Sequence, residues 1–373
     1  MNLSTQSIGT GHRPFVIAEM SGNHNQSLDR AFAIVDAAAE AGAHAIKLQT
    51  YTADSMTLDL SKGEFMISDP ASLWAGQSAH TLYGQAYTPW EWHAPIMARA
   101  KSMGLICFSS PFDESAVDFL ETLDVPAYKI ASFECVDLPL IRKAASTGKP
   151  LIISTGMATI PEIGEAVETA RSAGCKDLVL LKCTSTYPAS PENSHVRTIA
   201  HMRALFGCEV GLSDHTFGIG AAIAAVAFGA TLIEKHFTLS REEGGVDAAF
   251  SLEPHELAAL VTETERAWQA IGEIRYGPTE AEEKARLRRR SLYIAQDLQS
   301  GDVLTPRNLR RIRPGLGLAP KFYDMLIGQR VTRAIKAGTP MSWALVLSGG
   351  PERDGSLVIE VKTGGGITFG GST

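Results

Sequence analysis

The sequence contains two histidines, 21 positions apart, that each follow a short apolar run typical of a strand. His215 lies in Gly-Leu-Ser-Asp-His-Thr after residues 209–212, and His236 lies in Glu-Lys-His-Phe-Thr after residues 231–233. Small apolar residues at 219–228 indicate a buried helix between them. Because a strand-helix-strand unit of this kind is parallel and right-handed, both imidazoles should emerge at one edge of a sheet. Either histidine alone would be predicted to be structural, but the pair predicts a divalent metal site, which suits manganese, zinc or iron better than magnesium.

Polar residues of complementary kinds also follow the other predicted strands. Carboxylates, lysines and hydroxyls occur there, namely Glu19, Lys47, Ser110, Lys129, Ser132, Glu134, Ser154, Lys182, Ser185, Tyr187 and Lys235. Taken singly, each lysine is expected to form a salt bridge and each serine to cap a helix. Together at one mouth, lysines and hydroxyls suit the phosphate and carboxylate of one small molecule. With a metal beside them, they predict an anionic substrate such as phosphoenolpyruvate next to a carbonyl partner that needs polarising.

These residues need a scaffold that brings many strand ends together, and the chain alternates short β-branched runs with helical patterns. The strands are predicted at residues 15–18, 45–49, 105–108, 127–130, 151–154, 178–182, 209–212 and 231–234. The helices are predicted at residues 28–41, 90–103, 114–123, 138–147, 160–173, 195–205, 219–228 and 256–271. Eight such units predict a closed (β/α)8 barrel with its active site at the carboxyl ends of the strands. An open doubly wound sheet is the alternative, although no Gly-x-Gly-x-x-Gly loop follows any strand.

Residues 51–88 interrupt this rhythm with a long insertion after the second strand. Its aromatic residues Trp74, Tyr83 and Tyr87 are compatible with a lid over the site. A purely structural surface loop is an equal alternative, because long loops in compact domains occur in both roles.

Composition excludes several classes of protein. The 373 residues carry a net charge of -7, which argues against general binding to nucleic acid or membrane surfaces. No stretch approaches the ~18 apolar residues of a membrane span, and residues 1–12 are polar without the apolar core of an export signal. The five cysteines form no Cys-x-x-Cys pair and lie mostly in apolar runs. We therefore expect reduced thiols in a cytoplasmic protein.

The sequence changes character after residue 278. The expected organisation is a barrel domain at residues 1–278, a charged linker at 279–290, a compact β-rich module at 291–348 and a glycine-rich tail at 349–373. Glycine turns between short apolar runs predict the strands of the module, and residues 357–361 of the tail could add an edge strand.

Several ordered blocks resemble the sialic acid synthase family. They are Ile-Ala-Glu at 17–19, Asn-His-Asn at 23–25, Ala-Ile-Lys-Leu-Gln-Thr at 45–50, Lys-Ile-Ala-Ser-Phe-Glu at 129–134, Ser-Thr-Gly-Met at 154–157 and the two histidine segments. Residues 291–347 resemble the antifreeze-like (SAF) domain of that family, including its Arg-Pro-Gly-x-Gly segment at 313–317. The resemblance spans about residues 14–347. It implies a TIM barrel followed by a SAF domain.

The resemblance also implies a reaction, in which phosphoenolpyruvate, an open-chain amino-sugar aldehyde and water give a nine-carbon 2-keto acid and phosphate. The segments at 21–28 and 88–93 look like the pseudaminic acid synthase branch, whose sugar is 2,4-diacetamido-2,4,6-trideoxy-L-altrose. A sialic or legionaminic acid synthase is the alternative within the family. A non-enzymatic surface-binding role, suggested by the antifreeze-like module, would leave the strand-end lysines and histidines unexplained.

Roles for individual residues follow from the same resemblance. It implies that His215 and His236 hold the metal, with Mn2+ favoured and Mg2+ or Co2+ as alternatives, and that the aldehyde oxygen is polarised there. Glu19, Glu134 and Asp247 are the candidates for water activation and sugar contacts. Lys47, Ser110, Lys129, Ser132, Ser154, Ser185 and Tyr187 are expected around the substrates. Arg313 is expected to reach the sugar from the partner subunit, which requires a domain-swapped homodimer.

Overall fold

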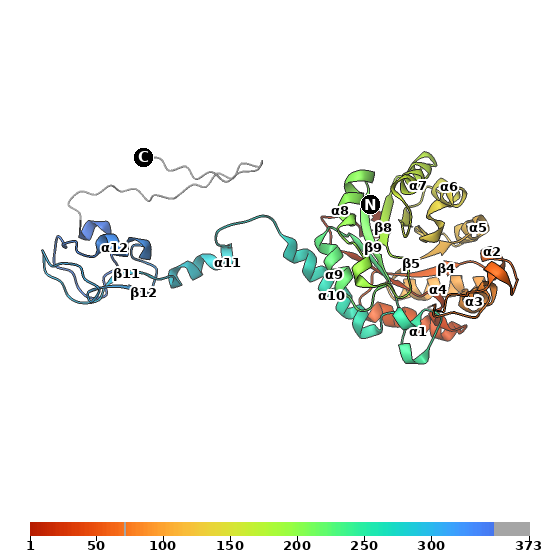
Figure 1. Cartoon of the computed structure of the whole chain (residues 1–373), viewed down its shortest axis with the longest axis horizontal. Coiled ribbons are helices and arrows are strands. Elements are labelled where there is room, and N and C mark those ends of the chain that lie inside the picture. The colour runs from red at the N-terminus through yellow and green to blue at the C-terminus, as the bar shows by residue number, and fades with distance from the viewer. Residues whose placement is uncertain (71, 347–373) are drawn as a thin grey trace. The chain divides into compact units, whose positions relative to one another are not determined.

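The computed structural model describes residues 1–70 and 72–346. The chain divides into two compact units, Met1–Glu273 and a second unit that begins at Ile274 (Figure 1). The bounds predicted for the domains, the linker and the tail stay a prediction.

The first unit is a closed barrel of eight parallel strands, so the predicted (β/α)8 fold is confirmed. The strands follow one another in the order β10-β3-β4-β5-β6-β7-β8-β9. Their bounds are β3 Phe15–Glu19, β4 Ala45–Thr50, β5 Ile106–Pro111, β6 Tyr128–Ile130, β7 Leu151–Ser154, β8 Leu178–Cys183, β9 Glu209–Asp214 and β10 Leu232–His236. Every predicted strand is present, and six of them extend further toward the site than the apolar pattern indicated.

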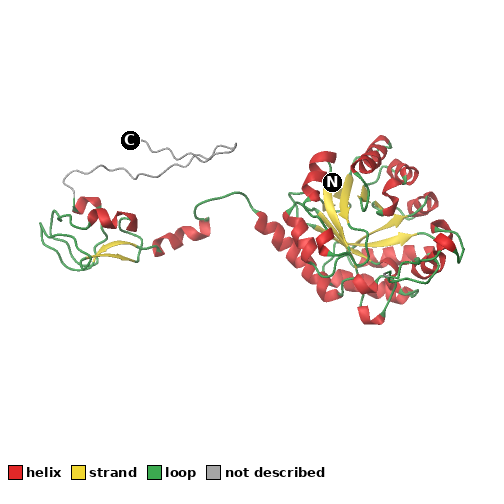
Figure 2. Cartoon of the chain, in the orientation of Figure 1, coloured by secondary structure: helices red, strands yellow, loops and turns green. Residues whose placement is uncertain are grey.

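Helices surround the strands on the outside of the barrel (Figure 2). The eight predicted helices correspond to α1 Leu28–Glu40, α4 Trp90–Ser102, α5 Glu114–Thr122, α6 Leu138–Ser146, α7 Ile160–Ser172, α8 Thr198–Phe206, α9 Gly220–Ala227 and α10 Pro254–Ile271. Side-chain caps fix several starts, for example Ser27 at α1 and Asp137 at α6. Helix α8 begins three residues later than predicted, at Thr198, and α9 begins one residue later, at Gly220.

Strands β3 and β10 close the barrel, and their register brings distant polar residues together. Leu232 pairs with Phe15 at one end and His236 with Glu19 at the other. On the other side of β10, Gly211 of β9 permits an unusually close approach, because a Cβ atom there would lie 2.2 Å from the carbonyl oxygen of Leu232. The strands that carry both histidines and Glu19 are therefore immediate neighbours.

A hairpin at the start of the chain fills the amino-terminal end of the barrel. Its strands are β1 Asn2–Leu3 and β2 Gln6–Ser7, which pair antiparallel. Leu3 and Ile8 are almost fully buried and pack among inward-facing residues of the strands, such as Phe15 and Phe108. The polar composition of this segment gave no indication of that role.

The insertion after β4 forms short elements rather than an unstructured loop. These are α2 Ala53–Met56, η2 Gly63–Phe65 and α3 Ala79–Ala86. Helix α3 packs against η1 Ser21–His24, and Gly22 allows this contact because a Cβ atom there would lie 3.0 Å from the Cα atom of Ala86. The side chain of Gln26 donates hydrogen bonds to the carbonyls of Gln85 and Tyr87 and so holds the end of α3.

The second unit has its own small core and less regular strand structure than predicted. Helical turns α11 Glu280–Glu283 and η7 Lys284–Arg288 precede an antiparallel pair, β11 Ser291–Ile294 and β12 Leu309–Ile312. Isolated bridges such as Leu298–Ile335 replace the other expected strands. The unit also contains η8 Pro320–Phe322, α12 Tyr323–Leu326 and η9 Trp343–Leu345, around a core that includes Leu292, Leu304, Leu309, Leu326 and Met341. The predicted tail and its edge strand lie outside the described residues.

Within residues 1–70 and 72–346, no helix has the length and apolar character needed to cross a bilayer.

Candidate active site

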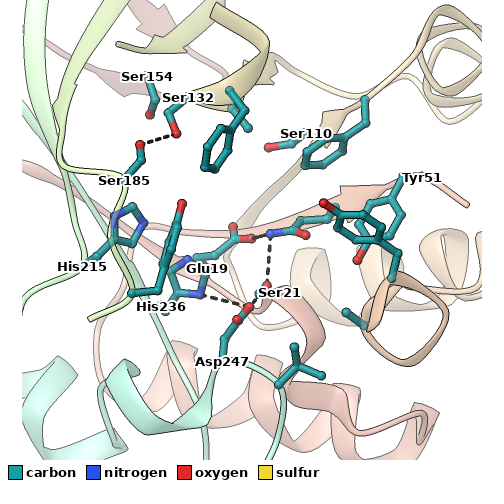
Figure 3. Close-up of a pocket in the computed structure, with 18 of the residues that line it drawn as sticks. Glu19, Ser21, Tyr51, Ser110, Ser132, Ser154, Ser185, His215, His236 and Asp247 are labelled. Carbon is teal, nitrogen blue, oxygen red and sulfur yellow. Dashed lines mark hydrogen bonds and ion pairs between the residues drawn. The ribbon is translucent and has the colours of Figure 1, made fainter. Parts of the chain in front are cut away.

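A cavity of about 510 Å³ opens at the carboxyl ends of the barrel strands. It is lined by all twelve barrel residues to which the family resemblance assigned a role: Glu19, Lys47, Ser110, Lys129, Ser132, Glu134, Ser154, Ser185, Tyr187, His215, His236 and Asp247. Those that Figure 3 labels come from different strands and loops of the barrel. The thirteenth, Arg313, is an exposed residue of the second unit that follows β12.

The two imidazoles lie close together at the cavity wall. The ring centroids of His215 and His236 are 5.3 Å apart. Nδ1 of His215 lies 2.9 Å from the carbonyl oxygen of Thr184 and donates to it, which leaves Nε2 as the nitrogen that could bind a metal. Nδ1 of His236 lies 3.6 Å from a carboxylate oxygen of Asp247. Burial, with the neighbouring His215, lowers the pKa of His236 well below its usual value, which favours the neutral form that binds metals.

These residues fit a divalent metal that takes two ligands from this chain. In the described part of the chain, no group of three or more His, Cys, Asp and Glu residues is arranged to hold a metal ion. The two imidazoles nevertheless offer nitrogen ligands of the kind that divalent transition metals bind. One of these nitrogens, Nδ1 of His236, is buried and has no hydrogen-bond partner. Water or substrate oxygens would complete the coordination.

Two buried lysines meet two buried carboxylates at the centre of the cavity. Nζ of Lys47 lies 2.6 Å from Oε2 of Glu19 and 3.9 Å from Oε1 of Glu234. Nζ of Lys129 lies 3.5 Å from the same oxygen of Glu234. Burial raises the pKa of Glu19 to about 7, against the opposing effect of Lys47, and burial lowers the pKa of Lys129. The cluster therefore holds cations that an anionic ligand can approach without water between them.

Hydroxyl groups gather beside these lysines. Ser185 donates a hydrogen bond to Ser132 over 2.7 Å, and Figure 3 shows Ser154 next to this pair. Oγ of Ser154 is buried and has no hydrogen-bond partner. Lys47 also donates to Ser110 over 3.0 Å. Hydroxyl groups next to buried cations, one of them the unpartnered hydroxyl of Ser154, suit the oxygens of a phosphate group.

Glu134 lies in the 3-10 turn η3, Phe133–Val136, at the edge of the cavity. Burial raises the pKa of Glu134 to about 7, and its Oε2 atom has no hydrogen-bond partner. A carboxylate with such a pKa can exchange a proton with a bound molecule near neutral pH.

Two lysines that we expected at this mouth are not part of the cavity wall. Nζ of Lys235 lies 3.0 Å from Asp214 and donates to the carbonyls of Thr216 and Gly218. Lys182 donates to the carbonyl of Cys183 and contacts Thr184. Both expectations were wrong because successive side chains of a strand alternate between its two faces. Lys235 instead stabilises the loop that follows β9.

The insertion contributes one wall of the cavity. Trp74 and Tyr83 line it, whereas Tyr87 does not. The indole of Trp74 donates to the carbonyl of Val246 over 2.9 Å, which ties the insertion to the loop after β10. The segment thus covers the site, and whether it moves as a lid stays a prediction. Sequence reasoning missed Tyr51 and Leu82 in this wall, because only tertiary packing turns them toward the cavity.

A closed parallel barrel with paired imidazoles, buried lysines and hydroxyls at the ends of its strands defines an enzyme of the (β/α)8 class. Comparison with known families specifies it further. Residues 34–276 match the model of the NeuB family, and residues 289–347 match the SAF domain. The chain belongs to the NeuB family, which confirms the family, the barrel and the SAF domain that the sequence motifs indicated.

Individual relatives agree with this assignment. The chain is 43% identical over 329 residues to the pseudaminic acid synthase of Campylobacter jejuni, covering 88% of this chain and 95% of that one. It is 35% identical over 341 residues to the N,N'-diacetyllegionaminic acid synthase of Legionella pneumophila, covering 90% and 95%. A crystal structure of N-acetylneuraminic acid synthetase from Leptospira borgpetersenii with citrate superposes with a TM-score of 0.69 at 31% identity, covering 76% and 94%.

Proposed function

We propose that this chain is a pseudaminic acid synthase. It condenses phosphoenolpyruvate with 2,4-diacetamido-2,4,6-trideoxy-L-altrose and water, and it releases pseudaminic acid and phosphate. The higher identity to a pseudaminic acid synthase than to a legionaminic acid synthase supports this choice of sugar. One observation supports the proposed reaction most directly. Two buried lysines and a cluster of serines line the same cavity as two adjacent imidazoles.

Phosphoenolpyruvate occupies the charged end of the cavity in this proposal. Lys47 and Lys129 bind its carboxylate and phosphate oxygens, and the hydroxyls complete the contacts with those oxygens. The hydroxyls are those of Ser110, Ser132, Ser154, Ser185 and Tyr187. Burial makes each charged hydrogen bond stronger than it would be in water, which favours a small dianion over the solvated state.

His215 and His236 hold a divalent metal, with manganese favoured and magnesium or cobalt as alternatives. When bound, such an ion supplies a Lewis acid for a carbonyl oxygen. The Thr184 carbonyl fixes the ring of His215, and Asp247 lies beside the ring of His236. These two contacts orient the imidazoles before any substrate arrives.

The reaction forms one carbon-carbon bond and one carbon-oxygen bond and breaks one carbon-oxygen bond. The methylene carbon of phosphoenolpyruvate attacks the aldehyde carbon, and the aldehyde oxygen takes a proton. Water adds to the former enol carbon and loses a proton. The new hydroxyl then becomes the keto group and gives its proton to the departing phosphate, which leaves with the bridging oxygen. Glu134, with its pKa near 7, accepts the proton from water, and Glu19 is the second carboxylate close enough to the lysines to assist. Asp247 contacts the sugar.

The second unit completes the site from a partner subunit through Arg313, in a domain-swapped homodimer. The distribution of charge supports this arrangement. Residues 1–273 contain 18 basic and 32 acidic residues, whereas residues 274–373 contain 16 basic and 9 acidic ones. Oppositely charged units of one chain favour contact between copies over repulsion. We also infer that the enzyme acts in the cytoplasm, because its cysteines are free thiols in the described structure.

Phosphate release tests the proposal directly. The full-length protein is incubated with phosphoenolpyruvate and, separately, with the pseudaminic precursor, its legionaminic counterpart and N-acetylmannosamine, with and without added manganese. We expect phosphate release with the first sugar, dependent on the metal. Faster turnover of either other sugar would assign the enzyme to another branch, and no turnover of any sugar would refute the synthase activity.

A further inference from the structure

The walls of the catalytic cavity differ in chemical character. The strand ends provide its ionised groups, among them Lys47, Lys129 and Glu234. The insertion provides a largely apolar wall made of Met56, Ile67, Trp74, Ala79, Leu82, Tyr83 and Ala86. Asp69 and Ser72 are the polar exceptions in that segment. The cavity is therefore a charged chamber with an apolar side.

Helix α3 presents one continuous face to this cavity. Ala79, Leu82, Tyr83 and Ala86 are spaced three, four and seven residues apart and all line it. Leu82 is 8% exposed. Helix α2 packs against α3 and adds Met56, which is half-buried. Two contacts support the wall: Gly22 lets α3 approach η1, and Gln26 donates hydrogen bonds to the carbonyls of Gln85 and Tyr87 at the end of α3.

The α3 part of the apolar wall packs against Tyr51, whereas Trp74 lies nearer the imidazoles, with 6.2 Å between its ring centroid and that of Tyr187. Figure 3 shows Tyr51 across the cavity from His215 and His236. The ring of Tyr51 packs edge-on against Tyr83 of α3, with 5.9 Å between centroids, and against Phe112. A sugar whose aldehyde carbon reacts near the imidazoles can extend its other end across the cavity, toward Tyr51 and helix α3.

We propose that Met56 and Leu82 form an apolar subsite that selects amino sugars lacking a hydroxyl on their terminal carbon. The inference rests on the proposed function and identifies residues that determine its substrate. A methyl group that packs against these side chains loses no hydrogen bonds when it leaves water, whereas a hydroxyl group there must give up its hydrogen bonds to water. An apolar pocket of this kind discriminates against an added hydroxyl by on the order of 100-fold.

Two matched sugars test the subsite. They are 2,4-diacetamido-2,4,6-trideoxy-L-altrose and the same sugar with a hydroxyl on carbon six, and the readout is kcat/KM from phosphate release. We expect the wild-type protein to prefer the deoxy sugar by roughly 10- to 100-fold. Leu82→Asn and Met56→Gln, which conserve approximate size, should each reduce that preference several-fold, mainly by slowing turnover of the deoxy sugar.

Leu58→Asn is the matched control, because Leu58 belongs to the same insertion but is 61% exposed and does not line the cavity. Its preference should equal that of the wild type. Equal use of both sugars by the wild type, or an unchanged preference in folded Met56→Gln, would overturn the subsite and leave the proposed function intact. If Leu82→Asn fails to fold, the half-buried Met56 still decides the question. Turnover of N-acetylmannosamine with neither altrose sugar used would overturn the proposed function and the subsite with it.

Discussion

Oε1 of Glu234 lies 3.5 Å from Nζ of Lys129, and both side chains are almost fully buried. The carboxylate holds the lysine in place within the barrel, while burial lowers the pKa of the lysine because its ammonium group has lost contact with water. A bound anion would replace part of that lost solvation, so this pair anchors the charged end of the cavity.

Lys129→Met removes the ammonium group and keeps much of the side-chain length. We expect the KM for phosphoenolpyruvate to rise roughly 10- to 100-fold, the loss for one hydrogen bond to a charged group. Steady-state kinetics at saturating sugar measure it. Lys182→Met is the control, since Lys182 donates to the carbonyl of Cys183 and does not line the cavity. An unchanged KM in folded Lys129→Met would remove this lysine from the substrate site.

His215→Ala and His236→Ala should each weaken manganese binding by on the order of 100-fold or more. Substituting even a residue that only hydrogen-bonds to a metal ligand typically lowers metal affinity by about 10- to 100-fold. Electron paramagnetic resonance of free manganese measures binding without any need for turnover. His255→Ala should bind as tightly as the wild type, because His255 is exposed and does not line the cavity. Manganese binding that survives both cavity substitutions would place the metal elsewhere.

Glu134 should govern the pH dependence of turnover. Burial raises its pKa to about 7, so it becomes ionised, and able to accept a proton, only as the pH rises through that value. We expect kcat to rise with pH along a limb near 7, and Glu134→Gln to lower kcat by roughly 10²- to 10⁴-fold and to abolish that limb. The exposed Glu165→Gln should change neither. A limb that persists in Glu134→Gln would assign it to another group.

The same pKa has a consequence for stability. An unfolded Glu134 releases its proton near the ordinary value of 4.5, whereas the folded one retains it until about 7. Between these values the folded state binds more protons, so the contribution of Glu134 to stability falls as the pH rises. Unfolding of Glu134→Gln should therefore depend less on pH than unfolding of the wild type in this window.

Leu3 should matter for folding stability and not for chemistry. Leu3→Ala empties part of the core at the amino-terminal end of the barrel and should lower the free energy of unfolding by about 2–5 kcal/mol. Urea denaturation measures this, and the KM for phosphoenolpyruvate should not change. Thr5→Ala, at an exposed position of the same hairpin, is the control. Equal stability of the two variants would mean that the hairpin contributes little.

Mixed dimers can test the domain swap. At phosphoenolpyruvate concentrations well below the KM, Lys129→Met and Arg313→Ala should each be nearly inactive alone. If Arg313 serves the partner's barrel, a heterodimer of the two variants contains one intact site, and random exchange of subunits should restore about a quarter of wild-type activity. Recovery to this level after mixing supports the swap. No recovery, with exchange verified by mass spectrometry, would show that Arg313 does not act across subunits.

The barrel was predictable because each strand is a short apolar run followed by a helix with ordinary start and stop signals. The nominated barrel residues were also accessible to sequence reasoning, since parallel strands place their ends at one edge. The orientation of side chains was harder to infer. Lys235 and Glu234 are adjacent in the sequence, yet only Glu234 faces the cavity, while Lys235 pairs with Asp214. Leu3 and Ile8 are isolated among polar residues, so no periodic pattern marks them as core.

The register of His236 with Glu19 joins the first barrel strand to the last. The site therefore lies where β10 pairs with β3 and closes the barrel, and these two strands are more than 200 residues apart in the chain. An intermediate in which β3 and β10 had not yet paired would contain most of the apolar core but would lack a complete set of ligand contacts. Metal and substrate, which would bind only the closed barrel, would then stabilise it relative to that intermediate and favour closure late in folding.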